Sequence, residues 1–381
     1  MTKSGGYIEA LKRDIRGDVY HDPVALGMYA TDASIYQIMP VAVVCPLDEN
    51  DVAVCVKVAS TYRIPILARG GGTSLAGQTV AEAIVIDFSK YMNSILLLDD
   101  RTVVVQPGVI RHQLNQFLKP RGLEFAPDPA TSSRATVGGM IANNSSGTKS
   151  ILYGKTSDHV LDLKVMLADG RIIHTRPLSA AELQHKLDSD DPDRDLYRGM
   201  MHIVSPLEEE VRVNYPKTLR RVGGYAFDDF IDSGYGDLNR IIIGSEGTLG
   251  IILEARLKLV DLPKYKGVSV VQFDHARDAI RATITMVKYN PAAVEILSRL
   301  LIGYSRKNIE TAAMCGFIKG EPDSIQMIEF YGHDPDEIRT RAEQMHEDLR
   351  QQGFGYAHDY YPEGKIYHDV WGIRERGLGL L

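Results

Sequence analysis

Three consecutive glycines follow a short apolar segment in the stretch Ile64-Pro65-Ile66-Leu67-Ala68-Arg69-Gly70-Gly71-Gly72-Thr73-Ser74-Leu75-Ala76-Gly77-Gln78. Glycine adopts positive φ without a Cβ clash, so successive backbone N–H groups can converge on one point. Thr73 and Ser74 add hydroxyl donors, and Arg69 adds either charge or a structural contact. The stretch predicts an anion cradle at the end of a buried strand. An ordinary glycine-rich turn is the alternative, because a short glycine motif alone is weak evidence.

Two further segments support the cradle. Residues 127–147 are dense in small and hydroxyl side chains and carry few charges, which suits backbone that lies against a ligand better than a solvated loop. Residues 243–252 form a glycine-containing turn between two strand-like runs. Polar side chains in such segments need partners, and a bound ligand is one source of them.

Together, these three segments resemble the FAD-binding domain of the vanillyl-alcohol oxidase family in their order and spacing. The similar branch contains D-lactate and D-2-hydroxyglutarate dehydrogenases and the glycolate oxidase flavin subunit. The likeness covers roughly residues 20–262 and is weaker beyond. It implies that FAD is held by Arg69, Gly70, Gly71, Gly72, Thr73, Ser74, Gly77, Gln78, Pro107, Gly108, Pro127, Asp128, Thr131, Thr136, Gly138, Gly139, Ala142, Asn143, Asn144, Ser145, Gly147, Glu246, Gly247, Gly250, Ile251 and Ile252.

The resemblance also implies how the cofactor is attached. Relatives with covalent flavin use a histidine within or beside the phosphate loop. Thr73 stands at that position and cannot form the bond, so we expect noncovalent FAD. Within the loop, backbone approach at Gly71, which we expect at positive φ, should matter more for the pyrophosphate than the charge of Arg69.

Other nucleotide sites fit less well. No G-x-x-x-x-G-K-[ST] phosphate loop occurs in the chain. A dinucleotide fingerprint of the Rossmann type should open a helix, whereas residues 79–87 read as another strand. A nicotinamide cofactor is therefore disfavoured.

The resemblance implies oxidation of a 2-hydroxy acid by hydride transfer from its α-carbon to flavin N5. A planar arginine fork binds a carboxylate bidentately. Arg374, in Trp371-Gly372-Ile373-Arg374-Glu375-Arg376, matches the catalytic-site arginine of similar dehydrogenases. The alternative is a surface arginine on a terminal helix. The sequence identifies neither the acid nor the electron acceptor, and a homodimer is one assembly it leaves open.

Composition argues against several other classes of protein. The 381 residues are 44% hydrophobic and 24% charged, with a net charge of −7, which argues against nucleic acid. No apolar run approaches a membrane span, and the polar start lacks the core of a signal peptide, so we expect a cytoplasmic protein. The cysteines are too few for an iron–sulfur site, and Cys55 suits a buried thiol. The eleven histidines stand singly along the sequence, so no metal is predicted.

The pattern of elements predicts an α+β fold. A two-subdomain FAD-binding domain should span residues 1–262, with subdomains at about 36–100 and 101–262. Asp48 suits the N-cap of a helix over 49–62 between strands. Asp169-Gly170 suits a tight hairpin turn, residues 176–215 are helical and charged, and the alternation over residues 252–260 predicts a strand with one buried face.

Residues 263–381 repeat a strand, helix, strand rhythm. The first copy covers 268–273, 276–289 and 292–297, and the second covers 325–331, 334–352 and 355–359. The rhythm predicts a ferredoxin-like α+β sheet, which resembles the substrate or cap domain of the family. The cap is expected to be partial and the chain to be the N-terminal part of a longer dehydrogenase. A noncatalytic FAD-binding subunit of a multi-subunit oxidase is the alternative.

Overall fold

The computed structural model describes residues 6–377 and divides into two compact units. Unit 1 contains the residues up to Ser146 together with Lys155–Asp261. Unit 2 contains Gly147–Gly154 together with the chain from Leu262 onward. The change of unit near residue 262 lies next to the predicted boundary. The assignment of Gly147–Gly154 to unit 2 had no sequence signal.

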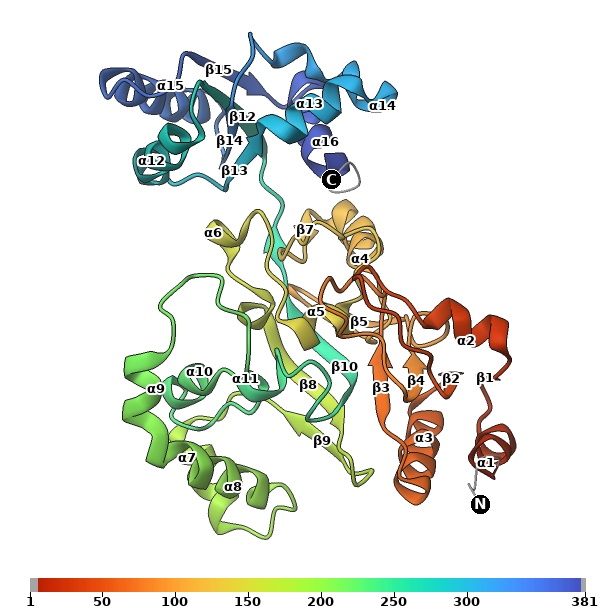
Figure 1. Cartoon of the computed structure of the whole chain (residues 1–381). Helices are drawn as coiled ribbons and strands as arrows, with labels where there is room; N and C mark the ends of the chain where they lie inside the picture. Colours follow the sequence, from red (N-terminus) through yellow and green to blue (C-terminus); the bar gives the residue numbers. More distant parts are fainter. Residues whose placement is uncertain (1–5, 378–381) are drawn as a thin grey trace. The chain divides into compact units, whose positions relative to one another are not determined.

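The first subdomain of unit 1 is built on a four-stranded sheet in the order β1-β2-β4-β3 (Figure 1). Its elements are α1 (Gly6–Asp14), β1 (Asp18–Tyr20), α2 (Pro23–Tyr29), β2 (Ala42–Cys45), α3 (Glu49–Tyr62), β3 (Ile66–Arg69) and β4 (Ile84–Asp87). The Asp48 side chain accepts a hydrogen bond from the Asn50 N–H, and Arg63 ends α3 in a left-handed conformation. The predicted helix over 49–62 is therefore confirmed, and Cys55 is fully buried beneath it.

The second subdomain is an antiparallel sheet in the order β5-β6-β10-β8-β9. Its elements are β5 (Ile95–Asp99), β6 (Thr102–Val105), α4 (Arg111–Leu118), α5 (Val137–Asn143), β8 (Val160–Met166), β9 (Ile172–Thr175) and β10 (Ile251–Lys258), with β7 (Leu123–Glu124) paired to β11 (Val260–Asp261). Gly170 has φ +85° in the predicted hairpin turn. The predicted subdomain limits were wrong, because β5 already pairs with β6 and residues 6–35 supply α1, β1 and α2 to the first subdomain.

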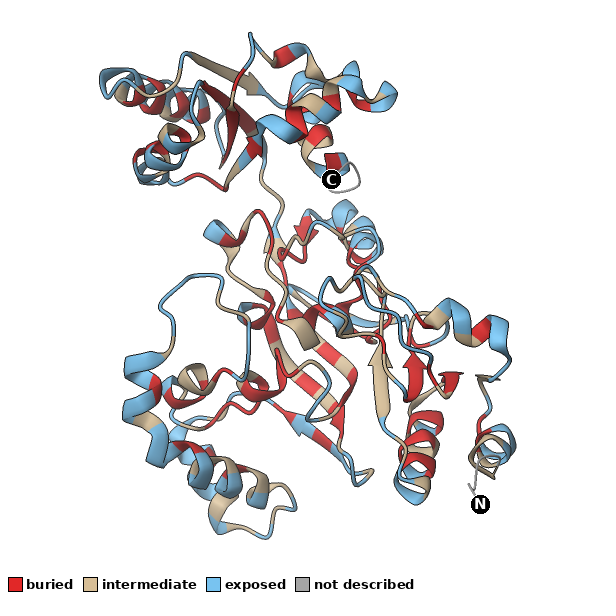
Figure 2. Ribbon diagram, viewed as in Figure 1, coloured by how far each residue is buried: buried red, intermediate tan, exposed pale blue. Residues whose placement is uncertain are grey.

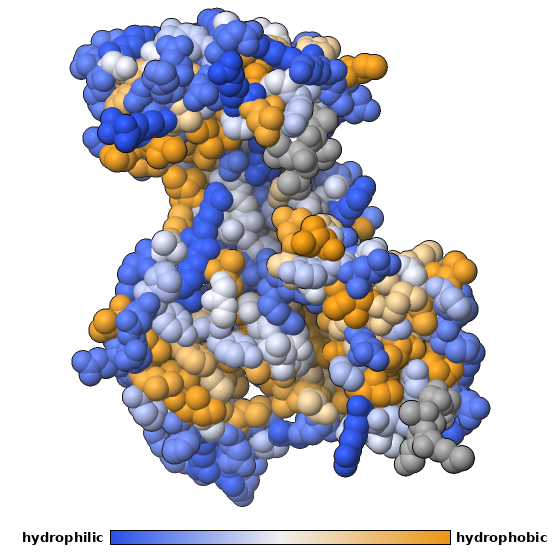
Figure 3. Space-filling view, in the orientation of Figure 1, coloured by the Kyte–Doolittle hydropathy of each residue, from blue (hydrophilic) through white to orange (hydrophobic). Residues whose placement is uncertain are grey.

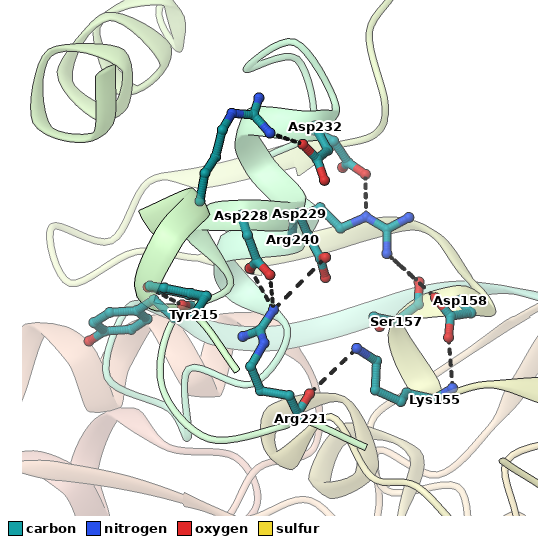
Figure 4. A network of polar contacts seen from close by, with 12 residues as sticks. Lys155, Ser157, Asp158, Tyr215, Arg221, Asp228, Asp229, Asp232 and Arg240 are labelled. Atoms are coloured by element: carbon teal, nitrogen blue, oxygen red, sulfur yellow. Dashed lines mark hydrogen bonds and ion pairs between the residues drawn. The ribbon is translucent and has the colours of Figure 1, made fainter. Parts of the chain in front are cut away.

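A helical region follows β9 in unit 1, and its first three helices lie within the predicted residues 176–215, whereas the last two were not predicted. It contains α7 (Ala180–Asp188), α8 (Arg194–Val204), α9 (Glu208–Asn214), α10 (Phe227–Asp232) and α11 (Asn239–Ile242). Figure 4 shows how it is fastened: the Arg221 guanidinium binds the Asp228 carboxylate and lies over the Tyr215 ring, while Arg240 reaches the carbonyl of Ser157. These contacts join the region to the segment that follows residue 154.

Unit 2 contains a four-stranded antiparallel sheet in the order β13-β14-β12-β15. Its elements are α6 (Ser150–Tyr153), β12 (Tyr265–Phe273), α12 (Ala276–Met286), β13 (Ala293–Ser298), α13 (Arg299–Lys307), α14 (Ile309–Ala312), β14 (Ser324–Gly332), α15 (Pro335–Gln351), β15 (Ala357–Pro362) and α16 (Lys365–Gly377). Numbered within the unit, the strand order is 2-3-1-4, the order of a ferredoxin-like sheet, as predicted. The helices α13 and α14 between the two repeats were not predicted.

The sheets supply most of the core. Figure 2 shows buried positions along β2, β4, β8 and β10 and on one face of α3. In unit 2, the sheet packs α12 and α15 against one face and α13 and α16 against the other. Some large apolar side chains stay exposed on and after α2, including Val24, Met28 and Ile35 (Figure 3). Among residues 6–377, no helix combines the length and apolarity needed to cross a membrane.

Candidate cofactor site

A cavity of about 80 Å³ in unit 1 brings the three sequence segments together. Fourteen predicted cofactor residues line it: Arg69, Gly70, Ser74, Gln78, Pro107, Thr136, Gly138, Gly139, Ala142, Asn143, Glu246, Gly247, Gly250 and Ile252. The segments come from the loop after β3, the helix α5 and the turn before β10. Residues far apart in sequence therefore share one concave surface.

The loop after β3 presents unused backbone donors. Along Gly71–Leu75, no N–H donates a hydrogen bond to another described residue. Gly72 and Gly77 have φ of +63° and +80°. Such a run of free N–H groups is the concavity that binds phosphate anions. The loop therefore fits the diphosphate of a dinucleotide by its backbone.

The expected positive φ at Gly71 is wrong, and packing explains this glycine instead. A Cβ on Gly71 would lie 2.3 Å from the Arg134 carbonyl oxygen, and one on Gly70 would lie 2.0 Å from Thr136 Oγ1. Glycine is required here because the loop presses against the segment that leads into α5.

Arg69 contributes mainly to the fold. Its Nη1 donates to the carbonyls of Tyr29 and Thr79 at 3.1 and 2.8 Å, and its Nη2 donates to the Thr31 carbonyl at 2.8 Å. Burial lowers the pKa of the guanidinium. Although Arg69 lines the cavity, both terminal nitrogens already have partners, which favours the structural alternative.

The helix α5 forms a second wall. Thr136 caps it by accepting from the Gly139 N–H. A Cβ on Gly138 would approach that of Pro107 to 2.6 Å, so only glycine permits this contact. Sequence analysis predicted backbone that lies against a ligand here but did not predict this helix of seven residues, because it contains a pair of glycines.

Side chains after α5 are tied to the turn before β10. Asn143 Nδ2 donates to Glu246 Oε1 at 2.8 Å, and Ser145 Oγ donates to Asn143 Oδ1 at 3.1 Å. Glu246 has φ of +53°, an uncommon value for a residue with a side chain, found often at functional sites. Asn144 Oδ1 accepts from the Ser157 N–H at 2.9 Å. Asn143 and Glu246 line the cavity, whereas Ser145 and Asn144 hold the adjacent backbone.

Twelve predicted residues do not line the cavity: Gly71, Gly72, Thr73, Gly77, Gly108, Pro127, Asp128, Thr131, Asn144, Ser145, Gly147 and Ile251. Asp128 forms an ion pair with the buried Arg111 at 2.9 Å, which holds its loop. Gly108 packs on the carbonyls of Phe88 and Met92, and Gly147 lies in unit 2. Close spacing to a motif was thus insufficient to place a side chain in the cavity.

Sequence analysis missed five lining residues: Ala68, Thr79, Phe88, Ile242 and Ser245. Ala68, Thr79 and Ser245 adjoin the quoted motifs, which was a usable signal. Phe88 and Ile242 follow β4 and end α11, and only the folded chain brings them here.

A larger groove adjoins the cavity. It measures about 490 Å³, lies between α3, β3 and the β8–β9 hairpin, and shares Ala68, Gly247 and Gly250 with the cavity. Ile251 lines this groove. Sites for drug-sized ligands measure roughly 300–1,000 Å³. The volume of the groove lies in that range, and its lining overlaps that of the cavity.

Arg374 lies in unit 2, on α16. Its Nε donates to Glu295 Oε2 at 3.3 Å, and both side chains are about one-fifth exposed. Within residues 6–377, its two terminal nitrogens have no ion-pair or hydrogen-bond partner. The guanidinium is therefore held through Nε, and Glu295 is its partner among the described residues.

The histidines are not all isolated. The rings of His346 and His358 lie 5.6 Å apart, although twelve positions separate them in sequence. The histidines stand singly along the sequence, as stated, but folding brings these two rings together. The described part of the chain contains no group of three or more His, Cys, Asp or Glu residues placed to hold a metal ion.

Comparisons with known proteins agree with this geometry. Residues 40–176 match the family described as FAD binding domain. The chain is 33% identical to a D-2-hydroxyglutarate dehydrogenase of Pseudomonas putida over 98% of the chain and 39% of that protein. It is 37% identical to the same enzyme of Escherichia coli, over 82% of the chain and 32% of that protein. It is 31% identical to the glycolate oxidase subunit GlcD of Bacillus subtilis, over 79% and 56% respectively.

The chain thus spans from about one third to just over half the length of these relatives. A solved structure of alkyldihydroxyacetonephosphate synthase matches with a TM-score of 0.69 and 19% identity, covering 99% of this chain and 64% of that one. The structural match supports the fold alone.

Proposed function

This chain carries an FAD-binding domain related to those of FAD-linked hydroxy-acid dehydrogenases, and on that premise we propose that it oxidises a D-2-hydroxy acid to the 2-oxo acid. The acid is of the D-lactate, glycolate or D-2-hydroxyglutarate type. Bound FAD supplies the acceptor for the α-hydrogen and two electrons, and the hydroxyl proton is released. An electron acceptor, which is not identified, reoxidises the protein. The homodimer and the cytoplasmic location stay predictions.

The free N–H groups of Gly71–Leu75 carry the cofactor part of the proposal. Because the fold leaves them without a protein acceptor, they are available to donate to the FAD diphosphate, and Ser74 adds a hydroxyl to the cavity wall. Gly138 and Gly139 let the backbone of α5 approach the ligand, while Asn143 is held by Glu246. Thr73 lacks the imidazole nitrogen that forms the histidyl flavin link, so the cofactor should be exchangeable.

Arg374 carries the substrate part. A guanidinium with a free edge binds a carboxylate through two parallel hydrogen bonds. The Glu295 contact leaves the Nη1–Nη2 edge available for that purpose. We assign the carboxylate of the hydroxy acid to this edge.

The test begins with the visible absorption spectrum of the purified chain. A flavin spectrum, with the colour left in the supernatant after acid precipitation, is expected for noncovalent FAD. Flavin in the protein pellet would contradict the role given to Thr73. A panel of D-2-hydroxy acids with an artificial dye acceptor then follows. A yellow chain that no acid bleaches would favour the noncatalytic FAD-binding subunit.

A further inference from the structure

We propose that Glu295 is a positioning residue, which orients the Arg374 guanidinium so that its terminal edge receives the substrate carboxylate. The inference rests on the proposed function, because Arg374 is the group being oriented. Glu295 lies on β13 and Arg374 on α16, 79 positions apart in sequence. No sequence motif links them.

The geometry of the pair determines which edge remains. An arginine fork can meet a carboxylate side-on, through Nε and one Nη, or end-on, through both Nη atoms. The Glu295 carboxylate occupies Nε at 3.3 Å. It therefore blocks the side-on mode and fixes the plane of the guanidinium. What remains is the end-on edge, with four N–H donors.

The helix that carries Arg374 is itself immobilised. Tyr367, Val370 and Ile373 of α16 are buried against the sheet, and the Tyr367 hydroxyl donates to the Glu329 carboxylate on β14. At the end of α16, a Cβ on Gly377 would lie 2.8 Å from Leu301 of α13, so the two helices are in close contact. With the backbone fixed, Glu295 is the hydrogen-bond partner that restrains the Arg374 guanidinium among the described residues.

Charge neutralisation is the main alternative role for Glu295. A carboxylate that only offsets the arginine charge would weaken anion binding, and its removal would tighten it. Removing a carboxylate that orients the fork would instead weaken anion binding, because the ligand would then have to order the long arginine side chain. The two roles are thus separated by the direction of one affinity change.

The same helix offers a matched control. Arg376 pairs with Glu310 at 3.7 Å, with side chains 48% and 77% exposed. This pair also joins α16 to another element of unit 2, yet exposed ion pairs contribute little. Glu310→Ala therefore removes a comparable carboxylate without touching Arg374.

The experiment compares the FAD-loaded parent with Glu295→Ala, Glu295→Gln, Arg374→Ala, Glu310→Ala and the double variant Glu295→Ala/Arg374→Ala. Half-saturation is measured for flavin reduction by D-2-hydroxyglutarate. Binding of oxalate, a carboxylate that does not reduce flavin, is followed by the change in flavin absorbance. FAD content and Tm are recorded for each variant.

We expect Glu295→Ala to raise half-saturation about tenfold, the scale of a hydrogen bond to a charged group, with little change in the limiting reduction rate. Glu295→Gln, which retains an acceptor oxygen, should recover part of the loss. Glu310→Ala should match the parent. The double variant should bind no more weakly than Arg374→Ala, because without the arginine there is nothing to orient.

Three results would overturn the inference. If Glu295→Ala bound the substrate as tightly as the parent or more tightly, while Arg374→Ala bound it more weakly, Glu295 would not be a positioning residue but Arg374 would keep its role. If the loss of substrate binding in Glu295→Ala came with a lower Tm and a lower FAD content, the pair would have a structural role only. Parent-like binding of both probes in Arg374→Ala would remove the arginine, and with it the substrate part of the proposed function.

Discussion

The glycine loop of unit 1 and the α16 surface of unit 2 each present an arginine, but the two are held differently. Arg69 donates to three backbone carbonyls through both terminal nitrogens. Arg374 donates from Nε to one carboxylate and keeps both terminal nitrogens for other partners. An arginine whose donors the fold consumes supports a loop, and one with a free edge can bind a ligand.

The two regions also differ in what builds them. The loop site depends on backbone: free N–H groups, two positive φ values and glycines at close approach. The substrate contact proposed on α16 depends on two side chains, Glu295 and Arg374, that meet only after folding. Substitutions should therefore damage the first site through geometry and the second through charge and orientation.

Gly71→Val should have the largest effect. Its Cβ would fall within 2.3 Å of the Arg134 carbonyl oxygen, so the loop must move away from the segment leading into α5. We expect loss of detectable FAD retention, measured by flavin fluorescence titration.

Gly223→Val is the matched control, because a Cβ there has no neighbour within 4 Å. It should bind FAD like the parent. Parent-like affinity in Gly71→Val would show that the cradle lies elsewhere.

Arg374→Ala comes next. Removing one charged hydrogen-bonding partner costs about 1.5–3 kcal/mol, or roughly ten- to a hundredfold in affinity. Half-saturation with D-2-hydroxy acids should rise by that factor while FAD content stays constant. Arg374→Lys should recover only part, because an ammonium lacks the planar fork. Unchanged saturation would place substrate binding away from α16.

Arg69→Ala should act mainly on stability. The carbonyls of Tyr29, Thr31 and Thr79 lose their donors, and several hydrogen bonds of this kind are worth about 2 kcal/mol together. We expect a lower Tm of the FAD-free chain and a smaller loss of FAD affinity than in Gly71→Val. A large affinity loss at unchanged Tm would instead assign Arg69 to the cofactor.

The sequence predicts features whose signal lies in adjacent residues, and it does not predict contacts between distant ones. Local signals located α3 by its Asp48 cap, the β8–β9 hairpin by Gly170 and the ferredoxin-like sheet by its repeated rhythm. The glycine loop was found for the same reason, since its chemistry is contained in adjacent residues. The Glu295–Arg374 pair and the cavity wall at Phe88 carry no local pattern, because they form by contacts across the fold.

Boundaries failed where pairing overrode the local pattern. β5 belongs to the second sheet because it forms a hairpin with β6, although its residues read equally well as the end of the first subdomain. Gly147–Gly154 follows a cofactor motif in sequence but packs with unit 2. Neither assignment can be made without knowing which surfaces meet.

The smallest expected effect loosens unit 2 alone, through pH. His346 of α15 is 3% exposed. Burial, the nearby His358 and Arg350 lower its pKa to about 4, and Asp359 opposes them. An unfolded histidine has a pKa near 6.5, so between pH 6.5 and 4 the unfolded chain binds more protons than the folded one. This contribution to stability is therefore fully present above pH 6.5 and is lost as pH falls toward 4.

The comparison is made between pH 7.5 and 6, where the expected loss is about 1 kcal/mol. The single tryptophan, Trp371, lies on α16, so its fluorescence during urea unfolding reports on unit 2. His346→Leu, which removes one of two neighbouring histidines whose pKa burial lowers, should reduce the pH dependence over this range, and His358 should retain part of it. His333→Gln, at an exposed histidine, should retain the parent profile. If parent and His346→Leu lost stability in parallel, another group would be responsible, and unit 2 would owe none of its pH sensitivity to this buried ring.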